Sequence, residues 1–275
     1  MAGKLFVVGT PIGNLSDFSS RGIETLSNVD FIAAEDTRVT RKLLNRFHIQ
    51  KPMFSYYEHN RIQHGAAILS RIQNGEDCAL VTDAGMPAIS DPGEDLVCSC
   101  HEQGIEVVAV PGPSAVITAL AVSGLSTGRF CFEGFLSVNK KNRKEHLEEL
   151  KEEKRTMVFY EAPHKLAATL NDMVVTFGDR RIVLTRELTK IHEEIQVTTL
   201  VQAAKFYERN PAKGEFVIII EGAAEPERQA FELCDAVNIA RECMHKGMSA
   251  SVAAKTAAAE TGLRKSEIYS YLNKE

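Results

Sequence analysis

Short apolar runs alternate with helical patterns through the first part of this chain. Strand-like runs lie at residues 5–8, 31–34, 53–57, 78–81 and 107–110. In the segments between them, apolar residues recur every three or four positions, as they do along one face of a helix. Strands and helices that alternate over short connections typically form a parallel sheet covered by helices. The sequence therefore predicts an α/β fold for this part of the chain.

The pattern changes after residue 128. Strand-like runs continue with helical segments between them, and their order suggests a mixed sheet with at least one hairpin; the runs lie at residues 130–132, 157–160, 182–184, 195–199 and 216–220. From residue 225 the pattern is helical only. We therefore expect an N-terminal α/β domain (1–117), a C-terminal α/β domain (118–224) and a small helical extension (225–275). The spacing in the extension fits a helix-turn-helix outline and equally a helical cap packed on the second domain.

Bulk properties limit the function classes. The chain has 275 residues and a net charge of −5, and no run approaches the length of about 20 apolar residues that spans a membrane. Its first residues lead directly into the strand at 5–8 and leave no room for a signal peptide, so we expect a cytoplasmic protein with no membrane contact. The negative charge argues against nucleic-acid binding through bulk electrostatics but allows a local basic patch.

Loops rich in Gly, Pro or charged residues follow four of the five predicted strands of the first domain. They cover residues 9–14, 35–38, 82–93 and 111–115. The first is neither a dinucleotide fingerprint nor a P-loop. Because the carboxyl ends of parallel strands meet at one edge, the four loops should meet there too. Glycine lets a backbone approach a ligand and proline restricts the loop beforehand, so the loops predict a small-molecule site.

Several charged residues in these loops have ordinary structural explanations as well. Asp36 can be a helix N-cap, His164 can be a residue at a helix start, and Glu187 can be an ion-pair partner of Arg186 or Lys190. The sequence excludes neither these structural roles nor a role of the same residues in the predicted site. No ligand spacing for a metal is present, since the Cys98-Ser-Cys100 pair lacks the second pair that a structural zinc site needs.

Nine short motifs in order carry a family resemblance. They are GTPIGNL, AAEDTR, TDAGMPAISDPG, PGPSA, FEGF, FYEAPH, FGDRR, RELTK and KGEF, which begin at residue 9 and end at residue 216. Together they resemble the tetrapyrrole-methylase superfamily. More closely, they are similar to the branch that methylates the ribose 2′-oxygen of a cytidine in 16S rRNA.

The resemblance implies two α/β domains with S-adenosylmethionine in the cleft between them, and a homodimer. It assigns a set of residues to the cofactor: Thr10, Pro11, Asp83, Gly85, Met86, Ile89, Ser114, Ala115, Tyr160, Lys213, Gly214 and Glu215. The turn-rich loop at 82–93 is then a backbone cradle for a folded cofactor.

Methylation of a ribose hydroxyl needs an in-line displacement and a group that removes the hydroxyl proton. The candidates for this base are Asp36, Glu35, His164 and Glu187, and the sequence does not choose among them. The 16S rRNA of the 30S subunit would be held by local positive charge. The candidates for this contact are Arg38, Lys140, Lys141, Arg143, Arg180, Arg181, Lys190, Arg264 and Lys265.

Two other functions remain open from the sequence. One is methylation of a small tetrapyrrole-type acceptor, against which the basic stretches and the C-terminal helices argue. The other is a non-catalytic RNA or ribosome-assembly binder that keeps the fold, against which the presence of all four loops argues. Cofactor binding separates the last function from the two enzymes, and the choice of acceptor separates the enzymes from each other.

Overall fold

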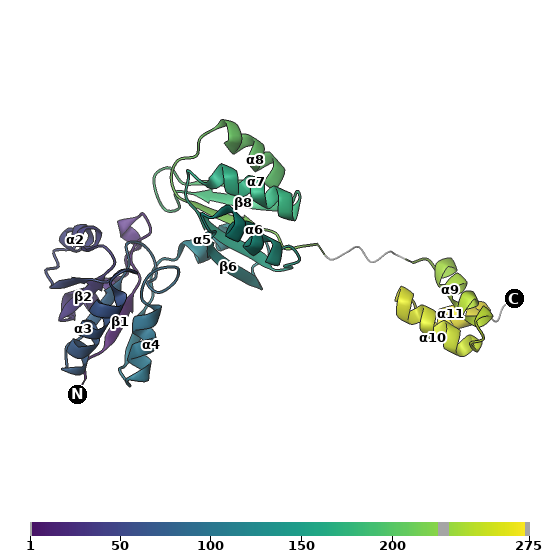
Figure 1. Cartoon of the computed structure of the whole chain (residues 1–275), viewed down its shortest axis with the longest axis horizontal. Helices are drawn as coiled ribbons and strands as arrows, with labels where there is room; N and C mark the ends of the chain where they lie inside the picture. The colour runs from purple at the N-terminus through teal and green to yellow at the C-terminus, as the bar shows by residue number, and fades with distance from the viewer. Residues whose placement is uncertain (1, 225–230, 273–275) are drawn as a thin grey trace. The chain divides into compact units, whose positions relative to one another are not determined.

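A computed structural model describes residues 2–224 and 231–272 of the chain (Figure 1). The chain divides into two compact units, Met1–Ala223 and Ala224–Glu275. The described residues of the first unit form two sheets of five strands each.

The first sheet is parallel throughout, with the strand order β3-β2-β4-β1-β5. Its strands are β1 (Leu5–Val8), β2 (Phe31–Ala34), β3 (Met53–Ser55), β4 (Cys78–Val81) and β5 (Val107–Val110). The helices between them are α1 (Ser20–Asn28), α2 (Thr37–Arg46), α3 (Arg61–Gln73) and α4 (Glu94–Glu102), and a short 3₁₀ turn, η1 (Leu15–Asp17), precedes α1. The parallel sheet confirms the expected α/β class.

Helices cover both faces of this sheet, which explains why its strands are apolar runs without alternation. Leu26 of α1 and Leu44 of α2 pack on one face with Val8 and Ile32. On the other face, side chains of α3 and α4 form a second core with residues of β1, β2 and β4; among them are Ile68, Ile72, Leu96, Leu5, Phe31 and Leu80. Because the strands are parallel, the carboxyl ends of all five lie at one edge of the sheet.

The second sheet is mixed, with the order β6-β7-β10-β8-β9. Its strands are β6 (Phe130–Phe135), β7 (Thr156–Glu161), β8 (Arg181–Arg186), β9 (Glu194–Thr199) and β10 (Phe216–Ile220). β6 pairs with β7 in parallel, whereas β8 and β9 form the expected hairpin. Side chains of α6 (Lys140–Glu149), α7 (Leu166–Phe177) and α8 (Leu200–Arg209) pack on one face of this sheet.

Helix α5 (Ala115–Ser123) begins directly after the β5 loop, yet it packs on the other face of the second sheet. Val116, Ala119 and Leu120 contact a cluster that contains Val183 and Val217. The expected boundary between residues 117 and 118 falls inside this helix, and the division into domains stays a prediction.

In the second unit, the described residues form α9 (Leu233–His245), α10 (Ala250–Thr261) and α11 (Lys265–Leu272). These helices share a small core that includes Val237, Ala253 and Ile268. The expected start of the extension at residue 225 lies outside the described residues. Among the helices that the structure describes, none has the length and apolar character needed to cross a membrane.

Candidate functional site

The loops after β1 and β5 touch through two glycines. Gly9 N donates to Val110 O at 3.0 Å, and a Cβ added to Gly9 would lie 2.7 Å from the Cα of Gly112. A Cβ added to Gly112 would in turn lie 2.7 Å from the carbonyl carbon of Gly9. Only glycine at both positions allows this approach, which brings the first and fourth predicted loops together.

The loop at 82–93 is joined to both neighbouring loops. Thr10 and Gly85 exchange backbone hydrogen bonds of 2.9 and 3.2 Å in an isolated bridge. On the other side, Thr82 Oγ1 donates to Glu35 Oε2, and the backbone N–H of Asp36 donates to Asp83 Oδ1 at 3.2 Å. The four predicted loops therefore meet at one edge, as the sequence indicates.

Strained backbone occurs in the loops of both sheets. Ala88 and Ser90 have φ values of 65° and 61°, and Glu187 and Thr189 in the loop after β8 have values of 51° and 66°. Such positive values are uncommon for residues other than glycine and often mark functional positions.

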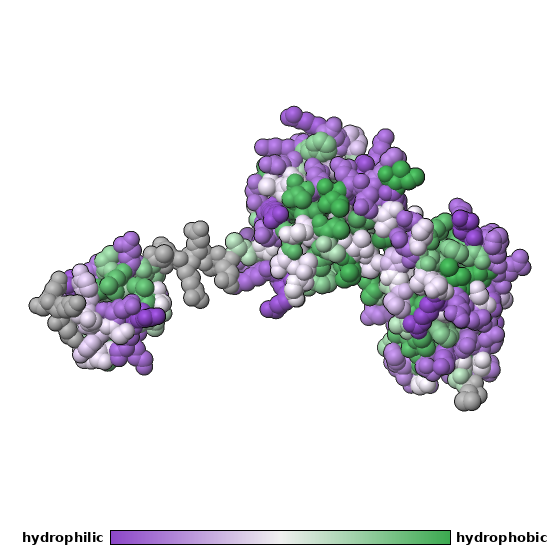
Figure 2. All heavy atoms as spheres, turned by 180° about the vertical axis from the view of Figure 1, so that it is seen from behind, coloured by the Kyte–Doolittle hydropathy of each residue, from purple (hydrophilic) through white to green (hydrophobic). Residues whose placement is uncertain are grey.

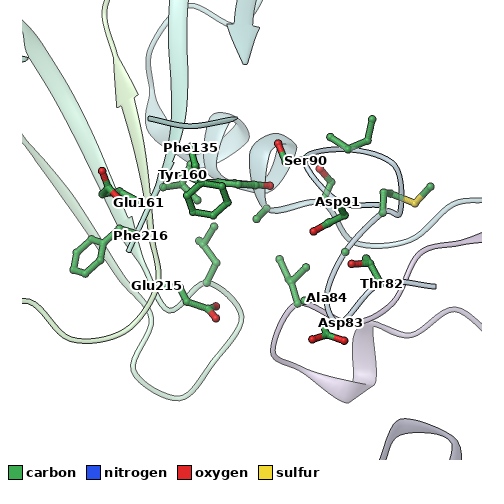
Figure 3. Close-up of a pocket in the computed structure, with 18 of the residues that line it drawn as sticks. Thr82, Asp83, Ala84, Ser90, Asp91, Phe135, Tyr160, Glu161, Glu215 and Phe216 are labelled. Carbon is green, nitrogen blue, oxygen red and sulfur yellow. The ribbon is translucent and has the colours of Figure 1, made fainter. Parts of the chain in front are cut away.

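A cavity of about 430 Å³ opens between the loops of the first sheet and the strands of the second. In Figure 3, Thr82, Asp83 and Asp91 lie on one side of it, and Tyr160 and Glu215 lie on the other. Pockets that enclose small molecules usually have volumes of about 300–1,000 Å³, so the cavity has the size of a ligand site.

The cavity is acidic. Its charged lining residues are Glu35, Asp83, Asp91, Glu161 and Glu215, and none of the described lining residues is Lys or Arg. Apolar groups cover much of the remaining wall, among them Ile12, Met86, Ile89, Leu188 and Val217. A ligand that combines apolar parts with a positive charge suits this lining.

The acidic residues influence one another. Burial, followed by the charge of Glu35, raises the pKa of Asp91 to about 6. The same two causes, in the same order, raise the pKa of Asp83. The hydroxyl of Thr82, which donates to Glu35, is also close enough to Asp91 to oppose the rise in its pKa. Perturbed carboxyl groups in a cavity are typical of functional sites.

One buried hydroxyl in the wall lacks a partner. Thr185 is fully buried and lines the cavity from β8, and its Oγ1 has no hydrogen-bond partner within the described part of the chain. Most buried polar groups in proteins are hydrogen-bonded, so such a group in a cavity wall is available to a ligand.

Most of the residues assigned to the cofactor from the sequence line this cavity. They are Asp83, Gly85, Met86, Ile89, Ser114, Ala115, Tyr160 and Glu215. Thr10 is buried beneath the loop at 82–93, through its bridge to Gly85. Pro11, Lys213 and Gly214 are outside the lining, and Gly214 packs against the side chain of Glu187. The roles of these residues stay predictions.

The four candidate bases differ in their surroundings. Glu35 lines the cavity, whereas Asp36 is the N-cap of α2 and its hydrogen bonds with Arg38 lower its pKa to about 2. Glu187 accepts from Lys190 Nζ at 2.9 Å and from the N–H of Glu215 at 3.0 Å, and these two bonds lower its pKa. His164 is exposed and is not part of the described lining.

Some of the candidate RNA contacts have partners within the protein. Arg143 forms an ion pair of 2.7 Å with Asp172 of α7, and its side chain is only 12% exposed. Arg180 stacks over Phe177 and donates to the carbonyl of Lys151. Lys190 joins Glu187 and Glu215. The remaining candidates are exposed: Arg38, Lys140, Lys141, Arg181, Arg264 and Lys265. RNA contact by any of them stays a prediction.

The cavity also contains residues that have no assigned role in the sequence interpretation. Asp91 lies in the predicted loop at 82–93 together with Asp83, but only the pairing of β2 with β4 brings Glu35 beside it. Thr185 and Phe135 lie within apolar strands, where nothing in the local sequence separates them from core residues.

Comparisons with known proteins add to this geometry. The model of the family described as Tetrapyrrole (Corrin/Porphyrin) Methylases matches residues 4–204. A protein of Synechocystis named Ribosomal RNA small subunit methyltransferase I is 46% identical over 97% of this chain and 96% of its own length. Proteins with the same name from Bacillus subtilis and Escherichia coli O157:H7 are 42% and 43% identical, over 97% and 98% of this chain and 93% and 94% of their own lengths.

Solved structures with low sequence identity share the fold. The methyltransferase CobJ has a TM-score of 0.60 at 20% identity and covers 82% of this chain and 97% of its own. The uroporphyrin-III C-methyltransferase of Thermus thermophilus, in complex with S-adenosyl homocysteine, has a TM-score of 0.57 at 15% identity, over 79% of this chain and 97% of its own. By its family match and its relatives over nearly full length, this chain belongs to the tetrapyrrole (corrin/porphyrin) methylase family.

Proposed function

We propose that this protein transfers a methyl group from S-adenosylmethionine to the ribose 2′-hydroxyl of a cytidine in 16S rRNA of the small ribosomal subunit. The observation that carries the proposal is the likeness of 42–46% over nearly the whole chain to proteins named Ribosomal RNA small subunit methyltransferase I. Because ribosomal subunits are cytoplasmic in bacteria, we also propose that the protein works in the cytoplasm.

The chemistry of the cavity fits S-adenosylmethionine. When bound, this cofactor supplies an electrophilic methyl group on a positively charged sulfur. Asp83 and Asp91 would offset positive charge on one side of the cavity, and Glu215 would do so on the other. The hydroxyl of Thr185, which has no partner among the described residues, would hydrogen-bond to a polar atom of the ligand. The touching loops of Gly9 and Gly112 would hold the backbone around it in place.

Asp91 is the group that we propose as the acceptor of the ribose proton. When the methyl group is transferred from the sulfur of the cofactor to the ribose oxygen, the carboxylate of Asp91 would accept the hydroxyl proton. A carboxyl group with a pKa of about 6 is a stronger base than Asp36, whose pKa is about 2. Glu187, whose pKa is lowered by Lys190, is a weaker base for the same reason. Glu35, at the end of β2, accepts a hydrogen bond from Thr82, and its charge helps to raise the pKa of Asp91.

The protein should act as a homodimer that uses the exposed side chains of the edge strand β9. β9 is an edge strand, and Ile195 and Val197 are 40% and 57% exposed on it. Val197 pairs with the buried Val183 of β8, so these two apolar side chains lead from the core to the surface. Figure 2 displays hydrophobic side chains gathered on one face of the part formed by the second sheet. Such edges are usually covered.

The first experiment is transfer of labelled methyl groups to 30S subunits from a strain that lacks this gene, with the labelled nucleoside identified. Label on the ribose of a cytidine supports the proposal. No label, together with cofactor binding in calorimetry, would contradict the acceptor and direct attention to a small tetrapyrrole-type acceptor. No cofactor binding would contradict both.

Association is tested separately by analytical ultracentrifugation of the purified protein. A dimer that Val197→Lys converts to a monomer supports the homodimer and its face, with Val175→Lys on α7 as the matched exposed control. A monomeric unaltered protein would contradict the homodimer.

A further inference from the structure

A fifth loop reaches the same edge of the first sheet, and the function proposed above does not use it. This is the β3 loop, residues 56–60. β3 pairs in parallel with β2, with Ser55 opposite Ala34, and Tyr56 N donates to Ala34 O at 2.7 Å. The loop therefore leaves the sheet beside Glu35, on the side where the cavity opens.

The β3 loop is firmly braced. The buried side chain of Tyr56 donates from its hydroxyl to Asp95 Oδ1 at 2.6 Å. Asn60 Oδ1 accepts from the N–H of Tyr57 at 2.8 Å, and Asn60 Nδ2 donates to Ser55 O at 3.1 Å. The same carbonyl of Ser55 lies 2.6 Å from Nδ1 of His64. Two side chains of the loop and one of α3 thus hold its backbone in one conformation.

The braced loop nevertheless presents aromatic groups to solvent. Tyr57 is 42% exposed, and its ring meets that of His59 edge to face at 6.3 Å and 86°. Two cations lie on the neighbouring elements. Arg38, in the first turn of α2, is paired with Asp36 and its side chain is 87% exposed. Arg61, the first residue of α3, is paired with Asp95 at 3.8 Å and its side chain is 50% exposed. An exposed aromatic group with cations beside it is the combination that binds single-stranded nucleic acid.

The strand order sets the position of this surface relative to the cavity. β3, β2 and β4 are consecutive neighbours in the sheet. The β3 loop, the loop after β2 with Arg38 and the loop after β4 with Asp83 therefore follow one another along the edge. Neighbouring strands lie about 4.8 Å apart, which puts the β3 loop roughly 10 Å from the loop that lines the cavity. A nucleotide next to one whose ribose lies at the cavity reaches this far.

We propose that Tyr57 stacks on an unpaired nucleobase that flanks the methylated nucleotide, with Arg38 and Arg61 beside the phosphates. The inference rests on the proposed function, because it requires an RNA acceptor. Sequence-tolerant stacking on aromatic rings is how proteins hold splayed single strands. The hydrogen bonds of Tyr56 and Asn60 fix the loop backbone that carries Tyr57 in the free protein. Less conformational entropy is therefore lost when RNA binds.

The test compares Tyr57→Ala and Tyr57→Phe in the full-length protein, with unmethylated 30S subunits as substrate. Loss of one stacked base typically weakens binding roughly 5- to 100-fold. We therefore expect Tyr57→Ala to raise KM for the subunit by this factor and to leave kcat and the Kd for S-adenosylmethionine within about twofold. Tyr57→Phe keeps the ring and should restore KM. Phe206→Ala on α8, where the ring is 49% exposed, is the matched control and should change nothing.

A second measurement identifies the occupant. Subunits reconstituted with an abasic nucleotide on either side of the methylated cytidine should show the same rise in KM at one of the two positions, with no further rise when Tyr57→Ala is combined with it. A rise in KM for Tyr57→Ala that neither abasic position reproduces would mean that Tyr57 contacts another part of the subunit, and would overturn the inference.

The two proposals fail in different ways. Transfer by the unaltered protein together with an unchanged KM in Tyr57→Ala would overturn the stacking inference alone. Absence of transfer by the unaltered protein would overturn the proposed function and the inference with it.

Discussion

Thr82 Oγ1 donates a hydrogen bond of 2.5 Å to Glu35 Oε2 and lies within hydrogen-bonding reach of Asp91 as well. Because a hydroxyl has one proton, only one of the two carboxylates receives it at a time. The loop after β4 and the end of β2 are therefore linked through Thr82. The charges of Glu35 and Asp91 interact, so a change in the charge of one alters the electrostatic energy of the other.

The rate should depend on pH through Asp91. Its pKa is raised to about 6, and a base must be deprotonated, so kcat should rise as the pH increases through about 6 and be lost below it. Asp91→Asn should lower kcat by roughly 10²- to 10⁴-fold and remove this dependence. Thr82→Val should move the acid limb to higher pH, because the hydroxyl of Thr82 lowers the pKa of Asp91. Measured pH–rate profiles decide the matter: an unchanged acid limb in Asp91→Asn would exclude Asp91.

The contact between Gly9 and Gly112 should tolerate no side chain. Gly9→Ala places a Cβ 2.7 Å from backbone atoms, which cannot move aside cheaply. We expect a loss of about 1–3 kcal/mol in the free energy of unfolding and weaker binding of S-adenosylmethionine, measured by denaturant unfolding and calorimetry. Gly128→Ala is the control, since its Cβ meets no described atom within 4 Å. Equal behaviour of the two variants would refute the steric argument.

Thr185→Val should separate stability from binding. The hydroxyl has no partner among the described residues, so its removal should leave the free energy of unfolding unchanged or raise it slightly. If a ligand uses this hydroxyl, its affinity should fall by about the 0.5–1.5 kcal/mol of one hydrogen bond. Thermal unfolding and calorimetry with S-adenosylmethionine measure the two effects. A loss of stability with unchanged affinity would show that Thr185 serves the fold instead.

Arg143 should contribute to folding to a much larger extent than its neighbour Lys141. Arg143 and Asp172 are paired at 2.7 Å, with side chains 12% and 13% exposed. Removing one partner leaves a buried charge, so Arg143→Ala should lower the free energy of unfolding by about 3–5 kcal/mol. The pair between Lys141 and Glu145 is 3.8 Å long and exposed, so Lys141→Ala should cost at most about 1 kcal/mol. Urea unfolding of the two variants gives the comparison, and similar losses would contradict it.

The side of the cavity that the loops of the first sheet form was predictable, because it depends on one rule of sheet topology. Once the apolar runs are recognised as parallel strands, the loops that follow them must share an edge, and the bridge between Thr10 and Gly85 agrees with this. The side that the second sheet forms depends on its strand order, β6-β7-β10-β8-β9. This order brings Phe135 and Thr185 to one cavity from strands that are not neighbours. No local pattern contains this information.

The end of β3 near Tyr57 could not be predicted correctly from the sequence. The apolar and aromatic run at 53–57 predicts a strand through Tyr57, but β3 ends at Ser55. The reason is the side chain of Asn60, which bonds to both Tyr57 and Ser55 and turns the chain toward α3. Propensity alone favours a longer strand, and a tertiary contact of one amide ends it.

The lining of the cavity also determines which molecules it excludes. Adenine nucleotides contain the same adenosine group as S-adenosylmethionine, but they carry phosphates. With Glu35, Asp83 and Asp91 on one wall and Glu161 and Glu215 on the other, and no described Lys or Arg to compensate, such anions would be repelled at every approach. Selection among adenosine-containing molecules would then depend on the sign of their charge, before any contact recognises the base.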